Sequence, residues 1–249
     1  MRFFSPSGEH PACGMFTPQH LITLGICLIL IVIGVYCSRK LKEKQIFWII
    51  RVVAILVTIL EIIKIGYKFY YNQTYLDAWF PLAYCSLFIY SIWMVGFGKG
   101  RIRAIGLGFL VGGGIIAGLA FLIFPTTSLM MHPIHHFLSI HSMIFHSLMM
   151  YVGITCYLHK LFVFNKKGYI SYCLFCLVFM FLALIVNKIY DCNMMFLKEP
   201  FNIPLPILQE IRNNNQGLYT LIIMVVYLTI PYGGVFLIDK ILNKGEKDV

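Results

Sequence analysis

The sequence is poor in charged residues, which make up 12% of its 249 positions. An ordinary soluble domain carries about 25%. With so few charges, the chain could not cover a water-exposed surface, and this scarcity excludes an ordinary soluble domain. Hydrophobic residues make up 59% of the chain, and the mean hydropathy is +0.81. The composition therefore predicts an integral membrane protein.

Soluble domains, internal repeats and low-complexity tracts are also missing from the sequence. The chain is instead a series of apolar runs, each near the roughly 20 residues that a membrane-spanning helix needs. We therefore expect an all-α membrane protein with one transmembrane domain over residues 1–249. It should form a bundle of about seven helices. The expected spans are 17–37, 46–71, 79–97, 104–124, 136–158, 169–188 and 216–238.

Acidic residues are few, ten against twenty lysines and arginines, and the net charge is +10. The basic residues gather in alternate loops, which argues for a topology signal and against a nucleic-acid partner. The positive-inside rule places the N-terminus outside and the C-terminus in the cytoplasm of a multi-pass protein, expected in the cell membrane. On the predicted cytoplasmic side lie Arg39, Lys40, Lys42, Lys44, Lys99, Arg101, Arg103, Lys160, Lys166, Lys167, Lys240, Lys244 and Lys247.

A few polar residues interrupt the expected spans. Ionisable groups inside a bilayer are costly and are functional candidates by default. All of them lie in the outer half of the membrane or near its midplane, which predicts a polar cavity opening outward between the second, third, fifth and sixth spans. These candidates are Glu61, Lys64, Cys85, His141, His146, Asn187 and, just beyond the sixth span, Asn193.

Glu61 and Lys64 are three residues apart on an expected helix. Residues at this spacing share a helix face, so the two side chains can form an ion pair. Such a pair can have a structural role, as an ion pair without net charge that fixes the second span in the bundle. It can also support a site in the cavity.

Cys85 is a candidate nucleophile. A lone membrane cysteine usually only packs, but it becomes nucleophilic when a nearby base takes its proton. His146 could be that base if the third and fifth spans are neighbours. His141 is the alternative, because its expected depth is close to that of Cys85.

The loop before the fifth span is rich in histidine. His132 and His136 have a metal-compatible spacing, but Pro133 between them argues against a helix there. We expect these loop histidines to form a solvated outer rim, with His136 kept as a supporting site candidate. Cys13 and Cys192 also fall on the expected outer side, where the two residues could form a disulfide.

Three motifs resemble those of a known family. The segment 81–85 (PLAYC) resembles an "LPLxxC" element, and the histidine-rich segment ending in His146 and Ser147 resembles a "PH…F…HG" element. The segment 193–200 (NMMFLKEP) resembles "NYMFLxxP". Ser147 replaces a glycine, and Met194 replaces a tyrosine. Together the motifs resemble the YwaF-like bacterial membrane proteins, a family similar to transmembrane protein 164, an acyltransferase acting on ether phospholipids.

The resemblance implies a nucleophile and a histidine inside the bilayer, which correspond here to Cys85 and His146. We therefore expect an acyltransferase or lipid hydrolase that acts on phospholipid acyl esters through a Cys–His dyad and an acyl-thioester, without a cofactor. Asn187 or backbone N–H groups could hold the oxyanion. Two alternatives stay open. One is a transporter or channel with a polar pathway, and the other is a zinc-dependent hydrolase, which needs three ligands.

Overall fold

The computed structural model describes residues 2–200 and 206–243, without the side chain of Arg2. Residues 201–205 of the longest loop, together with Lys244 and Lys247 of the basic tail, lie outside the described residues. Across the described ranges every regular element is a helix, and no strand occurs. The predicted all-α membrane fold is confirmed.

Six helices in the described residues are long and apolar enough to cross a membrane. They are α1 (Pro18–Ser38), α2 (Glu43–Tyr70), α5 to α6 taken as one helix (Gly100–Ile123), α7 (Phe137–Leu158), α8 (Lys166–Tyr190) and α10 (Gln216–Leu242). The shorter elements are η1 (Arg2–Phe4), α3 (Leu76–Trp79), α4 (Leu87–Phe97), η3 (Met194–Phe196) and α9 (Pro206–Asn214).

Side-chain caps fix where three of the long helices begin. The hydroxyl of Thr17 accepts the His20 N–H at 3.3 Å, and Pro18 opens the helix with its φ already fixed. The amide oxygens of Asn165 and Asn215 accept backbone N–H groups three residues on, at 2.9 and 3.0 Å. Each cap satisfies a helix-end donor that lipid could not hydrate.

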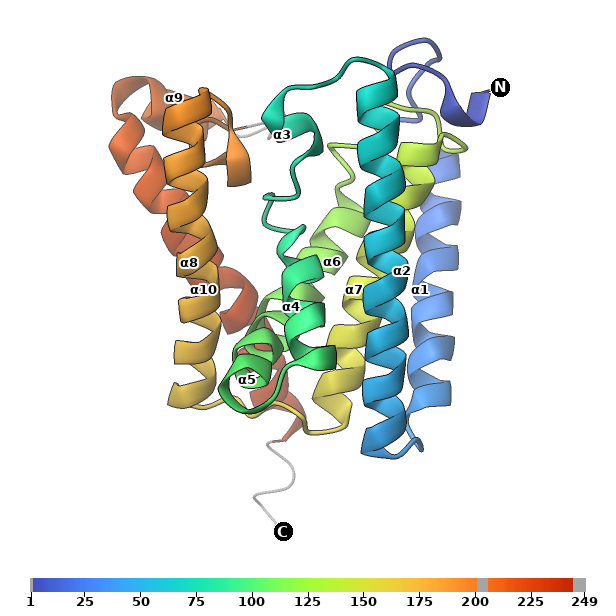
Figure 1. The fold of residues 1–249 in the computed structure, drawn as a ribbon, viewed down its shortest axis with the longest axis vertical. Helices are drawn as coiled ribbons and strands as arrows, with labels where there is room; N and C mark the ends of the chain where they lie inside the picture. Colours follow the sequence, from blue (N-terminus) through green and yellow to red (C-terminus); the bar gives the residue numbers. More distant parts are fainter. Residues whose placement is uncertain (1, 201–205, 244–249) are drawn as a thin grey trace.

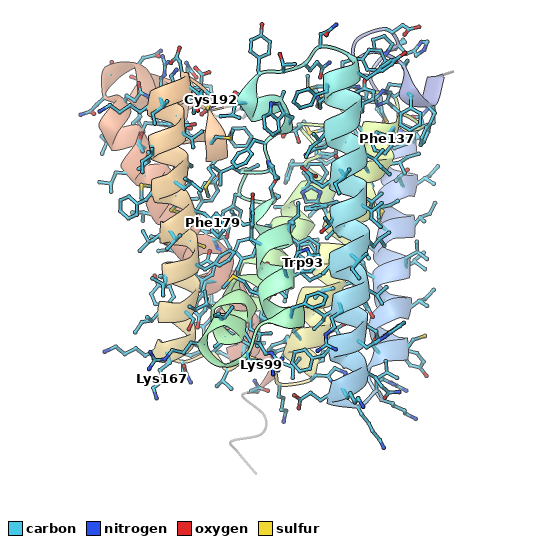
Figure 2. All side chains as sticks on the ribbon, viewed as in Figure 1. Trp93, Lys99, Phe137, Lys167, Phe179 and Cys192 are labelled. Atoms are coloured by element: carbon cyan, nitrogen blue, oxygen red, sulfur yellow. The ribbon has the colours of Figure 1, made fainter. Side chains whose placement is uncertain are left out.

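The helices form one bundle, with α1 at one edge, α8 at the other, and α4, α6 and α7 between them (Figure 1). The connections α1–α2, α4–α5 and α7–α8 all lie at one end, which we call the basic end (Figure 1). Lys99 and Lys167 mark it, whereas Cys192 and Phe137 lie near the opposite, N-terminal end (Figure 2). The basic loops therefore share one face of the bundle. The cytoplasmic assignment of that face stays a prediction.

The third expected span, 79–97, is helical only over its second half. Helix α3 ends at Trp79, Phe80 is extended with φ −74° and ψ 124°, and α4 begins at Leu87. Pro81 explains the break, because its ring disfavours the helical conformation at the residue before it and it has no N–H to donate. Cys85 therefore lies in a turn before α4 and not inside a helix.

A glycine-rich π-helical turn, η2 (Leu110–Gly114), joins α5 (Gly100–Phe109) to α6 (Ile115–Ile123) at the centre of the bundle. A Cβ on Gly112 would lie 2.6 Å from the ring of Tyr232, and one on Gly113 would lie 2.9 Å from the Tyr84 hydroxyl. Only glycine leaves room for these aromatic side chains. Small residues thus set the close packing here, as they commonly do between membrane helices.

Helix α1 is attached mainly through α7. Near its start, the Nε2 atom of His20 lies 3.0 Å from the carbonyl of Leu122. At its other end, the hydroxyl of Ser38 lies 2.7 Å from that of Tyr151. The long middle of α1 carries exposed apolar side chains that can face lipid.

Candidate functional site

A buried group of charged and ionisable side chains lies between α2 and α7. Glu61, only 5% exposed, has its Oε1 atom 2.5 Å from Lys64 Nζ. Its Oε2 atom lies 3.6 Å from Nε2 of His141. The ion pair expected from the i,i+3 spacing is present. His141 approaches the same carboxylate from α7, beyond hydrogen-bond distance.

His146 follows His141 by five residues on α7 and is 6% exposed. Its imidazole ring is held in one orientation. Its Nδ1 lies 2.7 Å from the carbonyl oxygen of Ser142. A carbonyl can only accept, so Nδ1 carries the proton and Nε2 is left with its lone pair. Among the described residues this Nε2 is buried without a hydrogen-bond partner. The ring stacks on Phe121, with 3.5 Å between the centroids.

Lys64 lies within electrostatic range of both histidines, and His146 within range of His141. We refer to Glu61, Lys64, His141 and His146 as the buried polar cluster. It contains one formal negative charge, one formal positive charge and two imidazoles. With both imidazoles neutral, the cluster therefore carries no net formal charge into its apolar surroundings, and either imidazole could take up a proton.

Cys85 is half-buried, and no hydrogen bond joins its thiol to either histidine of the cluster. Its carbonyl accepts the N–H of Phe88 at 3.1 Å. The ring of Phe88 meets the ring of Phe145, the neighbour of His146, with centroids 5.3 Å apart. Phe88 thus packs the first turn of α4 against the neighbour of His146 on α7, while the side chains of Cys85 and His146 stay unjoined.

Aromatic side chains surround Tyr84, the residue before Cys85. The ring of Tyr84 stacks on that of Tyr227 at 4.4 Å, and its hydroxyl lies 2.8 Å from the hydroxyl of Tyr172. Tyr227 lies within electrostatic range of the Cys85 thiol. Sequence reasoning missed Tyr227, and no local signal marks it, because α10 meets the turn before α4 only through the tertiary packing.

Asn187 and Asn193 fix a loop at the N-terminal end of the bundle. The amide of Asn187 donates to the carbonyl of Met194 at 3.1 Å and accepts its N–H at 2.6 Å. The Asn193 amide oxygen accepts the N–H groups of Lys198 and Glu199, at 3.1 and 3.2 Å. Both amides are therefore engaged with backbone groups of the segment 193–199.

This loop has unusual backbone geometry. Met195 and Phe196 have φ values of 56° and 54°, in the left-handed region that side chains other than glycine rarely adopt. Tyr227 and Tyr219 of α10 donate their hydroxyls to the carbonyls of these two residues, at 3.1 and 2.8 Å. Strained backbone persists only where its surroundings hold it, and α10 supplies that hold.

His132 and His136 are buried, at 3% and 0% exposure, so the expectation of a solvated rim is wrong for them. The N-terminal segment folds over this loop. Nε2 of His136 lies 2.9 Å from the carbonyl of Ser5, and its Nδ1 accepts the Leu138 N–H at 3.1 Å. The two imidazoles stack at 4.3 Å. Burial, followed by the nearby His136 and Lys68, lowers the pKa of His132 to about 4.

Cys13 and Cys192 do not form a disulfide, and all eight cysteines of the chain are free. The Cys13 thiol lies 3.4 Å from the Thr17 hydroxyl at the start of α1. The Cys192 thiol donates to the amide oxygen of Asn187 beyond the end of α8. Helices α1 and α8 lie at opposite edges of the bundle (Figure 1), which rules out the bond. Within the described residues no group of three His, Cys, Asp or Glu side chains is placed to hold a metal.

Two cavities have linings that include none of the four residues of the buried polar cluster. One, of about 740 Å³, is formed by the N-terminal segment and the last turns of α2. The other, of about 460 Å³, is an apolar groove between α1 and α7. Neither is lined by Cys85 or His146.

A family model described as the TMEM164 family matches residues 15–232. The matched region runs from the start of α1 into the second half of α10, and it includes Cys85, the buried polar cluster and the strained loop. No curated protein and no solved structure matches the chain.

Proposed function

Because the chain belongs to the TMEM164 family and is built from membrane-spanning helices, we propose that it transfers or hydrolyses the acyl esters of membrane phospholipids. One observation carries the proposal: His146 keeps a free, buried Nε2 while its Nδ1–H is committed to a backbone carbonyl. A neutral imidazole oriented in this way is suited to act as a general base. The motif resemblance assigns the nucleophile to Cys85.

The reaction would proceed in two balanced steps. Nε2 of His146 takes the Cys85 thiol proton, and the thiolate attacks the ester carbonyl carbon. A C–S bond forms, the ester C–O bond breaks, and the leaving alkoxide takes the proton from His146. A second lipid hydroxyl, or water, then gives its proton to His146 and attacks the thioester. The C–S bond breaks and the thiolate is reprotonated.

The contact of Phe88 with Phe145 supports this pairing, because it packs the first turn of α4, which follows Cys85, against the neighbour of His146. Hydrogen bonds between catalytic groups are often long without substrate and tighten in the substrate complex. Asn187 is a poor oxyanion donor, since its amide is already bonded to Met194. Backbone N–H groups are the better candidates for this role, and His141 is the reserve base.

The test is mass spectrometry of purified protein after incubation with mixed phospholipids. We expect a mass increase of one acyl chain on the peptide that contains Cys85, and its loss in Cys85→Ala. Cys173→Ala is the matched control, because Cys173 is also a partly exposed cysteine. An adduct of equal yield on Cys173, or acyl exchange that survives Cys85→Ala, would contradict the assignment of the nucleophile.

A further inference from the structure

The cavity at the N-terminal end of the bundle has a wall of aromatic rings and one carboxylate. Its volume of about 740 Å³ lies within the roughly 300–1,000 Å³ typical of small-molecule sites. The residues that line it are Phe4, Ser5, Pro6, Glu9, His10, Ile63, Gly66, Tyr67, Tyr70 and Tyr71. Five of them come from α2 and its C-cap, and five come from the N-terminal segment.

The three tyrosines form a continuous aromatic wall. The ring of Tyr71 lies 4.9 Å from that of Tyr67 and 4.9 Å from that of Tyr70, with interplanar angles of 57° and 88°. Tyr67 and Tyr71 donate their hydroxyls to the carbonyls of Ser5 and Phe4. These bonds fix two rings, whereas Tyr70 is 78% exposed and forms the open side of the wall.

Lys64 and Lys68 of α2 do not line this cavity. The lining positions Ile63, Gly66 and Tyr70 follow the spacing of one helix face. Lys64 is held by Glu61, and Lys68 donates to the side chain of Gln73 at 2.7 Å. Among the described residues that line the cavity, the one carboxylate is that of Glu9, 52% exposed, and the imidazole of His10 lies 3.8 Å from it.

We propose that this cavity binds a quaternary ammonium group, held against the faces of Tyr70 and Tyr71 and beside Glu9. Cations are attracted to the electron-rich faces of aromatic rings, and aromatic cages are the recurring solution for quaternary ammonium ligands. A trimethylammonium group offers no hydrogen-bond donor. It therefore suits a wall whose fixed hydroxyls are already committed to carbonyls.

The position of the cavity favours a lipid headgroup as the source of that group. Ile63 and Gly66 lie on the same helix as Tyr70 but up to seven residues earlier, which is about 10 Å deeper along the helix axis. A Cβ on Gly66 would meet nothing within 4 Å, so the floor is open. A headgroup at Tyr70 would leave its acyl chains running along the apolar surface of α2.

The test uses the purified full-length chain in detergent and native mass spectrometry, without turnover. Phosphatidylcholine, phosphatidylethanolamine and phosphatidylglycerol with identical acyl chains are titrated separately. A soluble arm uses tetramethylammonium chloride, with sodium chloride at matched ionic strength. We expect saturable binding of one phosphatidylcholine, several-fold tighter than the other two lipids.

Variants at Tyr70 separate the contribution of the aromatic ring to lipid binding from that of its hydroxyl. Tyr70→Leu should weaken phosphatidylcholine binding about two- to fivefold, and Tyr70→Phe should retain it, because the ring face makes the contact. Combining Tyr70→Leu with Glu9→Gln should reach about tenfold. Tyr75→Leu is the matched control, since Tyr75 is 79% exposed and lies outside the cavity lining.

Equal binding of all three lipids, or equal losses in Tyr70→Leu and Tyr75→Leu, would overturn the proposal. Saturable binding of tetramethylammonium without phosphatidylcholine would overturn the lipid source. The experiment measures binding alone at a site remote from Cys85, so its failure would leave the proposed acyl transfer unaffected.

Discussion

A single backbone carbonyl determines which ring nitrogen of the neutral His146 side chain carries the proton. By accepting the Nδ1–H, the oxygen of Ser142 leaves Nε2 as the free nitrogen. The stack on Phe121 holds the ring plane, and burial keeps water from the lone pair. Its own helix and α6 thus hold the ring in the orientation that the proposed base would need.

At the same scale, Glu61 should depend on Lys64. Glu61→Gln leaves the Lys64 ammonium without its counter-ion, and we expect a loss toward the lower end of about 3–5 kcal/mol, because Lys64 is 21% exposed. The double variant Glu61→Gln, Lys64→Met should recover part of this loss. Unfolding in a detergent titration measures it. A double variant as unstable as the worse single variant would show that pairing is not the cause.

His132 should make stability depend on pH. Its folded-state pKa is about 4, below the roughly 6.5 of an unfolded chain. Between these values the unfolded state binds more protons, so stability should fall as the pH drops from about 6.5 to about 4 and then level off. His132→Phe should flatten this slope in thermal unfolding curves. His135→Phe, at an exposed position, should leave it unchanged.

Local spacing explains which residue-level features could be predicted. The Glu61–Lys64 pair follows from one helical turn and needs no knowledge of the fold. The burial of His132 and His136 could not be predicted, because it depends on a segment more than 120 residues earlier folding across them. The neighbours of Cys85 depend on tertiary packing in the same way.

At the scale of elements, the glycine-rich α5–η2–α6 helix determines how near α7 can come. A Cβ on Gly118 would lie 2.9 Å from the carbonyl oxygen of His146, and backbone cannot move aside cheaply. Close packing of membrane helices depends on such small residues. The helix that stacks Phe121 on His146 is thus also the one that fixes its backbone.

We therefore expect Gly118→Ala to destabilise the protein by about 1–3 kcal/mol and to lower any activity that needs His146. Gly25→Ala is the matched control. A Cβ there meets nothing within 4 Å, and alanine favours a helix by about 1 kcal/mol, so stability should hold or rise. Thermal unfolding of both variants in the same detergent measures the difference. Equal behaviour would argue against the backbone contact.

The long helices could be predicted because a bilayer demands long apolar runs. Hydropathy does not predict the half-length of α4, because it averages over a window, while one proline stops a helix at one residue. Pro81 is visible in the sequence, but the apolar pattern does not show its effect on the span. The π-helical turn η2 has no sequence signal beyond its three glycines.

At the scale of the whole molecule, the basic loops share one end of the bundle (Figure 1). If that end is cytoplasmic, a cysteine at Lys99 should react with a membrane-impermeant maleimide only after cells are opened. A cysteine at Tyr75, 79% exposed at the opposite end, should react in intact cells. Replacing the exposed native Cys37 by serine lowers the background. Labelling of the cysteine at position 99 in intact cells would contradict the predicted topology.

The attachment of α1 has a consequence for biosynthesis. Its main partner, α7, ends about 120 residues later in the chain, which a ribosome making about 5–20 residues per second needs about 6–24 s to complete. During that interval α1 lacks the helix that is its main partner. Its two polar contacts, His20 and Ser38, lie at its ends, where headgroup water can hydrate them. The apolar middle and polar ends of α1 therefore suit a helix that lies in the bilayer before α7 is synthesised.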